Sequence, residues 1–296
     1  MTSIGFIGIG NMGLPMVANL VRAGFAVHAY DIRREAVDAA AGQGAEALTS
    51  AAEAARLEVV VTMLPDSPDV EAAYLGPKGI LEGASPGLVC IDMSTIDPAT
   101  TRRVGDRLQA AGVRMLDAPV SGGVPRAIDG TLTIMVGGDA DLVERARPIL
   151  GAMGANVIHI GPLGTGEVAK ICNNLLAGVS MIAVAEAMTI GIRAGVDPRV
   201  LHEVIRKSSG SCWALEHNCP VPGLAPKAAS NGGFAPGFMT DLMAKDLALA
   251  RAAARDVGAA CFSGALAHEL YTLASRHGLG RKDFSAVIEV LGGRRR

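Results

Sequence analysis

Hydrophobic residues in the first half of the chain gather in short, almost uninterrupted runs. The runs are SIGFIGI, FAVHAYD, EVVVTML, LVCIDMS, VRMLDAP and LTIMVGG, and helical patterns such as 11–22 and 35–41 lie between them. Strands that are apolar on both faces are typical of a parallel sheet covered by helices on both sides. The pattern therefore predicts a Rossmann-type α/β domain with a doubly wound, mostly parallel sheet.

The pattern changes near residue 162. One long helical segment is predicted over 164–194, and helical patterns continue from Asp197-Pro198 to the end of the chain. We therefore predict two domains, residues 1–163 and an all-α domain of residues 164–296, linked by the long helix.

Two segments of the second domain differ from their surroundings. Residues 208–237 are rich in Gly, Pro, Ser and Asn, so they predict a long loop of the kind that often carries function. Residues 175–188 are the most hydrophobic stretch, but they are too short for a membrane span and contain Ser180 and Glu186. We predict a buried helix there and no membrane partner.

Composition narrows the class of protein. Half of the 296 residues are hydrophobic, 3% are aromatic and the formal net charge is −2, which favours a globular protein and argues against nucleic acid as a partner. The five cysteines form no Cys-x-x-Cys pair, the six histidines show no metal-ligand spacing, and Met1 leads directly into an apolar run. These features predict a cytoplasmic protein with reduced thiols, without a signal peptide or a metal site.

The first apolar run ends in Gly8-Ile9-Gly10-Asn11-Met12-Gly13, which fits the G-x-G-x-x-G pattern. An ordinary strand–helix turn is the simpler interpretation, but here a strand precedes the glycines, a helix follows them, and a second strand ends in an acid. In that setting Gly8 permits the tight turn, Gly10 the approach of a pyrophosphate, and Gly13 close packing of helix and strand. The sequence predicts a dinucleotide site.

Asp31 lies 18 residues after Gly13, at the end of the second predicted strand. A carboxylate there accepts hydrogen bonds from ribose hydroxyls and repels a 2′-phosphate, so NAD is favoured over NADP. Arg33 and Arg34 follow closely, and a guanidinium can pair with a 2′-phosphate, so the strictness of this preference stays open.

Four motifs in order, GFIGIGNMGLPMVANLVRAG, DAPVSGGVPRAIDGTLTIMVGG, GEVAKICNNLL and LMAKDLALA, resemble the β-hydroxyacid dehydrogenases over nearly the whole chain. Within that family, SSGSCWALEHNCPVPG and the following NGGF resemble the 3-hydroxyisobutyrate dehydrogenases. The resemblance implies NAD-dependent oxidation of 3-hydroxyisobutyrate, a small 3-hydroxy acid, to methylmalonate semialdehyde in valine catabolism. It also implies a homodimer or homotetramer.

The resemblance assigns roles to residues that match the family's motifs. Lys170 matches the catalytic lysine and Asn174 the asparagine one turn later. The residues expected to hold the substrate are Ser121, Gly122, Gly123 and Trp213, although a lone tryptophan is also commonly a packing anchor. Those expected to contact the cofactor, besides the three glycines and Asp31, are Asn11, Met12, Leu64, Pro65, Asp69, Thr95 and Lys245. The role of Asp246 stays open.

The chemistry suits this assignment. Oxidation of an alcohol removes a hydride from carbon and a proton from oxygen, and a positioned base near the hydroxyl takes the proton. Lys170 and Asn174 are four residues apart, so on a helix they share one face. A surface lysine is the simpler interpretation of Lys170, but its apolar neighbours predict a largely buried helix, where burial and the charge of the cofactor ring lower a lysine's pKa.

Departures from the family leave the substrate open. The chain has Asn218-Cys219-Pro220 where the subgroup has Asn-Pro, an acid at Asp69 where a neutral polar residue is expected, and Arg126 in a loop that is often small. A related semialdehyde reductase, acting for example on tartronate semialdehyde, is therefore an alternative. Imine reductases and non-catalytic NAD(P)-binding modules share the architecture, but they carry another residue in place of Lys170.

Overall fold

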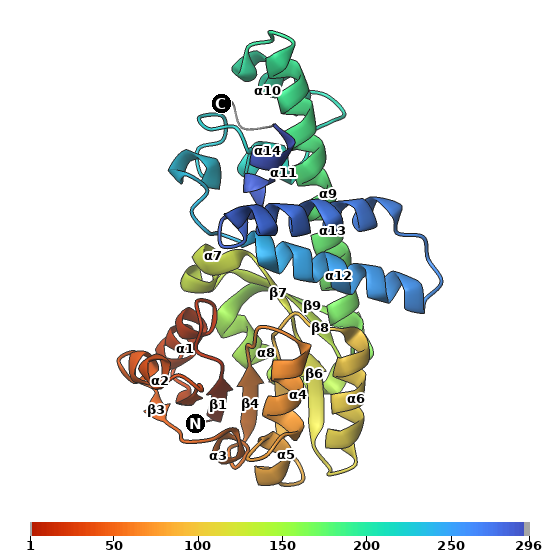
Figure 1. The fold of residues 1–296 in the computed structure, drawn as a ribbon. Helices are drawn as coiled ribbons and strands as arrows, with labels where there is room; N and C mark the ends of the chain where they lie inside the picture. Colours follow the sequence, from red (N-terminus) through yellow and green to blue (C-terminus); the bar gives the residue numbers. More distant parts are fainter. Residues whose placement is uncertain (1, 293–296) are drawn as a thin grey trace. The chain divides into compact units, whose positions relative to one another are not determined.

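Within the described part of the chain, residues 2–292 of a computed structural model, one nine-stranded sheet organises the N-terminal region (Figure 1). Its strands are β1 Ser3–Ile7, β2 Ala26–Tyr30, β3 Glu46–Ala47, β4 Val59–Thr62, β5 Val89–Asp92, β6 Arg114–Asp117, β7 Val120–Ser121, β8 Leu132–Gly137 and β9 Gly154–Gly161. Their order is β3-β2-β1-β4-β5-β6-β8-β7, with β9 paired to β8. The first six strands have the Rossmann order 3-2-1-4-5-6.

Helices cover both faces of this sheet. One face carries α1 Gly13–Arg22, α2 Arg34–Ala41, α7 Gly123–Asp129 and α8 Ala140–Met153; the other carries α3 Ala51–Ala54, α4 Ser67–Leu75, α5 Ile80–Gly83 and α6 Pro98–Gln109. Side chains alternate along each strand, so Val59 and Val61 of β4 join the first core and Val60 joins the second. The predicted doubly wound α/β fold is confirmed.

The far edge of the sheet is mixed. β8 runs antiparallel to β6 and β7, whereas β9 pairs with β8 in parallel. The sequence pattern did not predict β9, although Val157, Ile158 and Ile160 give it a short β-branched segment; most residues of Gly154–Gly161 are exposed.

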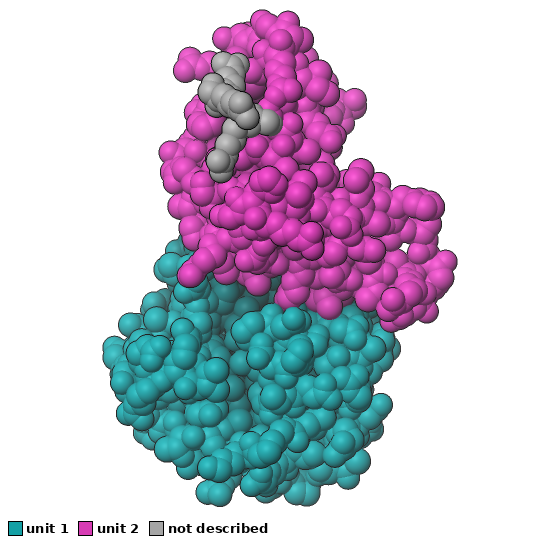
Figure 2. Space-filling model, viewed as in Figure 1, with its two compact units in different colours: residues 1–170 teal, residues 171–296 magenta. Residues whose placement is uncertain are grey.

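The C-terminal region is helical, as predicted. It contains α9 Thr165–Arg193, α10 Pro198–Arg206, α11 Trp213–His217, α12 Thr240–Asp256, α13 Phe262–Ala274 and α14 Ile288–Leu291, with short turns η1 Ala229–Gly232, η2 Ser275–Leu279 and η3 Phe284–Val287. Elements α11 and η1 lie inside the predicted long loop. The chain divides into two compact units, residues 1–170 (unit 1) and 171–296 (unit 2), so the division falls inside α9, whereas the sequence placed it just before this helix (Figure 2).

The predicted helix over 175–188 is present, but it is only partly buried. Only 33% of the most apolar 18-residue window of α9 is buried, and its mean hydropathy is 1.9. Met181, Ala185 and Met188 pack into the core of unit 2, but Leu176 is 69% exposed and Ile190 is 67% exposed. The cause is that α9 is apolar around most of its circumference, while its partners cover one side. Among residues 2–292 it is also the one helix long and apolar enough to span a membrane.

Candidate functional site

The glycine-rich loop between β1 and α1 has the geometry that its three glycines require. Gly8 has φ +97°, and a Cβ there would collide with the carbonyl oxygen of Met63. A Cβ on Gly13 would collide with the carbonyl oxygen of Gly8, whereas a Cβ on Gly10 would have no heavy atom within 4 Å. Gly8 and Gly13 are therefore needed for the fold, and Gly10 leaves open space beside the backbone.

The start of α1 suits an anion. Its N-cap residue is Met12, whose side chain makes no capping hydrogen bond, and the first turn contains no acidic residue. The positive end of the helix dipole therefore meets no negative side chain from its own first turn. Together with the open space at Gly10, this end of the helix fits the pyrophosphate of a dinucleotide.

Asp31 follows β2 and is tied to the glycine loop. Its Oδ2 accepts a hydrogen bond from the N–H of Ile9 (2.7 Å), and its Oδ1 accepts from the N–H (2.9 Å) and the Nε (3.2 Å) of Arg33. Burial opposes ionisation of Asp31, but these hydrogen bonds outweigh it and hold its pKa below the usual value. Asp31 is thus a carboxylate at neutral pH, and Arg33 is paired with it.

The loops after β4 and β5 are joined by a buried polar network. The Leu64 N–H donates to Ser94 Oγ (2.8 Å), and Ser94 Oγ donates to Asp92 Oδ1 (2.6 Å). Thr62 Oγ1 also donates to Asp92 Oδ1 (2.7 Å). Burial and the nearby negative charge of Asp117 raise the pKa of Asp92. The network fixes the loop of Leu64 and Pro65 against the loop of Thr95.

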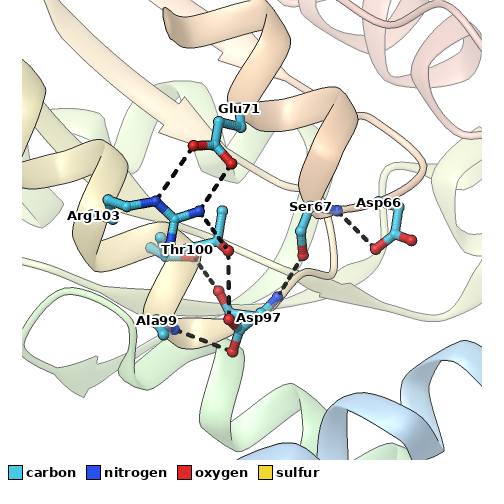
Figure 3. Close-up of polar contacts among 8 residues, drawn as sticks. Asp66, Ser67, Glu71, Asp97, Ala99, Thr100 and Arg103 are labelled. Carbon is cyan, nitrogen blue, oxygen red and sulfur yellow. Dashed lines mark hydrogen bonds and ion pairs between the residues drawn. The ribbon is translucent and has the colours of Figure 1, made fainter.

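A second set of contacts joins the helices that follow these loops (Figure 3). Asp66 and Asp97 cap the first turns of α4 and α6, and the N–H of Asp97 donates to Ser67 Oγ (3.1 Å). One turn further along, Glu71 of α4 pairs with Arg103 of α6 (2.9 Å). The spacing of the two loops is therefore set by the contact at the helix starts and again by the ion pair one turn later. Asp69, also in the first turn of α4, is exposed, and its cofactor contact stays a prediction.

The Ser121-Gly122-Gly123 segment turns sharply at the start of α7. Ser121 ends β7 and pairs with Thr133 of β8, while Gly122 and Gly123 have φ values of +138° and +65°. Arg126 packs across the turn, since a Cβ on Gly122 would lie 2.6 Å from its Cδ. Successive residues in such conformations point backbone N–H groups into one concave surface, which suits a carboxylate.

Lys170 is buried on α9, and the first turn of this helix is bonded to the sheet. Asp117, the last residue of β6, accepts hydrogen bonds from the N–H groups of Gly164 (Oδ1, 2.7 Å) and Glu167 (Oδ2, 2.9 Å). Glu167 Oε2 in turn accepts from the N–H of Ile96 (3.2 Å), next to Thr95. Asp92, Asp117 and Glu167 belong to no site predicted from the sequence. An acid at the end of an apolar strand was the available signal for the two aspartates.

Unit 2 holds the remaining predicted residues. Asn174 is buried, and its Nδ2 donates to Asp246 Oδ2 (2.5 Å) while its Oδ1 accepts from Asn173 (3.0 Å). Lys245 Nζ lies 3.3 Å from Asp246 Oδ1. Asp246, whose role the sequence left open, therefore orients the amide of Asn174. Trp213 begins α11 and is 56% exposed, so it is not a core packing anchor in this chain.

The loops after β1, β4, β5 and β6 all follow the carboxyl ends of parallel strands, where open α/β sheets bind their ligands. With the glycine loop and Asp31, this edge defines a Rossmann-type dinucleotide-binding protein. Residues 3–161 match the family described as the NAD binding domain of 6-phosphogluconate dehydrogenase, and residues 164–291 match the NAD-binding region of NADP-dependent 3-hydroxyisobutyrate dehydrogenase. The chain belongs to the 3-hydroxyisobutyrate dehydrogenase family of β-hydroxyacid dehydrogenases.

Individual relatives agree on the family and differ in substrate. The chain is 46% identical to the NAD-dependent L-serine dehydrogenase of Pseudomonas aeruginosa over 97% of both chains. It is also 46% identical to the 3-hydroxyisobutyrate dehydrogenase of that organism, over 99% of this chain and 100% of the relative. A structure of Mycobacterium tuberculosis 3-hydroxyisobutyrate dehydrogenase with L-serine has a TM-score of 0.94 at 43% identity, covering 99% of this chain and 100% of that one.

Imine reductases share the fold alone. The enzyme from Myxococcus stipitatus superposes with a TM-score of 0.66 at 14% identity, over 98% of this chain and 99% of its own. At this identity, the likeness to imine reductases is one of fold and carries no evidence of a shared reaction.

Proposed function

We propose that this protein oxidises 3-hydroxyisobutyrate to methylmalonate semialdehyde with NAD, with Lys170 as the general acid/base. The observation that carries the proposal is the buried Lys170 on α9, whose first turn is bonded to Asp117 at the end of β6 and to Ile96 beside Thr95. A lysine held at the carboxyl end of the sheet, where such folds bind their ligands, is suited to act as a positioned base.

The proposed roles follow from the chemistry of the chain's own groups. NAD, when bound, supplies the nicotinamide ring that accepts the hydride from the carbinol carbon. Lys170 Nζ takes the hydroxyl proton as the carbonyl forms, and returns it in the reverse direction. Asn174, oriented by Asp246, donates a hydrogen bond to the same oxygen, and the backbone of 121–123 binds the substrate carboxylate.

The preference for NAD rests on Asp31. Its lowered pKa keeps a full negative charge where the adenosine ribose of a dinucleotide lies, and that charge disfavours a 2′-phosphate. Arg33, the residue best suited to bind such a phosphate, is engaged by the same carboxylate (3.2 Å). The family description that names NADP makes the comparison of the two cofactors a necessary part of any assay.

L-Serine is the second candidate substrate. The relative named NAD-dependent L-serine dehydrogenase is as similar to this chain as the relative named 3-hydroxyisobutyrate dehydrogenase, at 46% identity each. Both acids present a carboxylate and a β-hydroxyl in the same relation, so Lys170 and the 121–123 loop serve either. They differ at the α-carbon, which carries a methyl group in one and an ammonium group in the other.

A substrate panel tests the proposal. Reduction of NAD and NADP is followed at alkaline pH with 3-hydroxyisobutyrate and L-serine, and oxidation of NADH is followed with tartronate semialdehyde. We expect the highest kcat/KM with 3-hydroxyisobutyrate and NAD. A higher kcat/KM with L-serine or with tartronate semialdehyde would replace the substrate, and no turnover with any of them would refute the proposed activity.

We also propose that copies of the chain associate through unit 2. The exposed apolar side of α9 and the exposed Phe262 (86%) and Leu266 (63%) of α13 form a surface that a second copy would cover. Sedimentation should show a dimer or tetramer for the wild type and a smaller species for Leu176→Asp. Ile128→Asp, at an apolar residue of unit 1 that is 55% exposed, is the matched control and should leave the mass unchanged. A wild-type monomer would refute this proposal.

A further inference from the structure

Asp117 links the end of β6 to the start of α9, two parts of unit 1 that are distant in sequence. Its two carboxylate oxygens bind N–H groups 47 and 50 residues away, at the start of α9. Some other helices of this protein are capped by the residue just before them: Asp97 caps α6 and Asp197 caps α10. A residue just before a helix satisfies the free N–H groups of its first turn equally well. The distant cap on α9 has an additional consequence, because it fixes the start of that helix to the end of β6.

The start of α9 lies so close to the Asp117 carboxylate that no side chain would fit between them at Gly166. A Cβ on Gly166 would lie 2.8 Å from Asp117 Oδ2 and 3.0 Å from the backbone nitrogen of Gly137. Asp117 and Glu167 are both fully buried. The first turn of α9 therefore lies against the carboxylate and the β8 backbone at a distance that only glycine permits.

The chain on the other side of Asp117 is equally fixed. The N–H of Ala118 donates to the carbonyl of Asp92 (2.6 Å), and the N–H of Met135 donates to the carbonyl of Pro119 (3.0 Å). Two residues later Ser121 is paired in the sheet. Hydrogen bonds therefore fix the backbone between Asp117, which holds α9, and Ser121, four positions later in the proposed substrate loop.

Glu167 provides a second link from the same helical turn. Its N–H donates to Asp117, and its Oε2 accepts from the N–H of Ile96, the residue after Thr95. Lys170 lies three residues further on, which places it on the same side of the helix as Glu167. The loop proposed to contact the nicotinamide is therefore connected to the helix one turn before Lys170.

We propose that Asp117 and Glu167 are positioning residues that hold Lys170 in register with the substrate loop at Ser121 and the cofactor loop at Thr95. This inference rests on the proposed acid/base role of Lys170. Neither carboxyl group touches substrate in this proposal; each acts through the backbone it binds. A small displacement of a catalytic group lowers kcat strongly while leaving cofactor affinity intact.

The experiment compares Asp117→Asn with Asp197→Asn, which changes a carboxylate that accepts two N–H groups at the start of α10. In Asp117→Asn an amide NH₂ faces a backbone donor, so the helix start shifts. We expect kcat to fall ~10- to 100-fold with NADH affinity within about twofold of wild type, and hydrogen exchange of the 164–170 amides to accelerate. Asp197→Asn should change neither. An unchanged kcat in Asp117→Asn would overturn the proposal.

Glu167 supplies an independent variant should Asp117→Asn fail to fold. Glu167→Ala removes the acceptor for the Ile96 N–H and should lower kcat about 10-fold, whereas Glu167→Gln keeps an oxygen there and should restore it to within about threefold. Equal losses in the two variants would overturn the role of this hydrogen bond.

A double-mutant cycle separates positioning from general damage. If Asp117 acts through Lys170, its substitution should lower the residual turnover of Lys170→Ala by less than about threefold, because no amine is left to misplace. Full additivity would overturn the positioning role and leave the proposed function standing. Wild-type turnover in Lys170→Ala alone would instead overturn the acid/base assignment, and the positioning role with it.

Discussion

Units 1 and 2 both bury carboxyl groups, but in different settings. In unit 1, Asp92 and Asp117 end neighbouring strands. Asp92 accepts a hydrogen bond from Ser94, next to the predicted cofactor residue Thr95, and Asp117 accepts from the backbone at the start of α9, the helix that carries Lys170. In unit 2, Asp283 accepts from Asn218 (2.9 Å), from the N–H of Phe238 (3.0 Å) and from Ser285. The first arrangement aligns ligand-binding loops at a sheet edge, whereas the second holds the 208–237 segment to the C-terminal turns.

The units also differ in their surfaces. Of the described large apolar residues that are exposed, five lie in unit 1 and ten in unit 2. A sheet covered on both faces buries its apolar side chains within one chain, whereas α9 and α13 bury one side and leave other apolar side chains exposed. We therefore expect substitutions in unit 1 to act mainly on turnover and cofactor choice, and those in unit 2 mainly on stability and association.

Lys170→Ala should have the largest effect. Removing the base leaves the hydroxyl proton without an acceptor at the reacting oxygen, so kcat should fall by at least ~10²-fold while NADH binding stays largely intact. Steady-state kinetics and NADH fluorescence measure the two quantities. Lys207→Ala on α10, which breaks an exposed pair with Glu203, is the control and should keep wild-type kcat. Equal turnover in the two variants would refute the role of Lys170.

The sequence predicted the features whose pattern lies within one short segment and missed those that depend on contacts between distant segments. Apolar runs located six strands of the sheet, and the glycine motif with Asp31 located the predicted cofactor loop, because each signal lies within one short segment. The strand β9, most of whose residues are exposed, was not predicted.

The positions of Asp117 and Glu167 show what sequence reasoning missed. Asp117 bonds to backbone groups 47 and 50 residues away, and Glu167 to one 71 residues away. Only the strand order brings these partners together, so no local pattern identifies them. The exposed side of α9 escaped prediction for a related reason, because a helix that is apolar on most sides has no periodicity to show which side is covered.

Asp283→Ala should be the most destabilising change in unit 2. The carboxylate is 2% exposed, and its loss leaves buried donors of Asn218, Phe238 and Ser285 without their acceptor. Because buried donors left without an acceptor are costly, we expect the free energy of unfolding to fall by about 3 kcal/mol. Urea unfolding measures it, and Asp256→Ala, on the exposed end of α12, should stay within about 0.5 kcal/mol of wild type. An equal loss of unfolding free energy in Asp283→Ala and Asp256→Ala would contradict the proposed structural role of Asp283.

Asp31→Asn should change cofactor choice and leave the chemistry unaltered. The substitution removes the charge that repels a 2′-phosphate and releases Arg33 to bind one, so kcat/KM for NADP relative to NAD should rise ~10- to 100-fold. Steady-state kinetics with both cofactors measure this ratio. Asp38→Asn breaks a similar pair with Arg34 (3.0 Å) on exposed α2 and should leave the ratio as it is. A constant ratio in Asp31→Asn would disprove the assigned role.

Asp92→Asn should have the smallest effect, visible as a change in the pH dependence of stability. Burial and the nearby negative charge of Asp117 raise the pKa of Asp92 in the folded protein, so the stability that its neutral form contributes is fully present below its ordinary value of 3.8 and is lost as pH rises through the folded value. The neutral variant lacks this loss, so its free energy of unfolding in urea should rise relative to that of wild type as the pH increases from 4 to 7. Asp31→Asn should show the opposite sign below pH 3.8, because the pKa of Asp31 is lowered and the stability that its carboxylate contributes is lost only as pH falls through that range. The opposite result would be a free energy of unfolding that falls for Asp92→Asn relative to wild type as pH rises. In that case Asp92 would be ionised in the folded protein, and its role in joining the loops of Leu64 and Thr95 would depend on its charge.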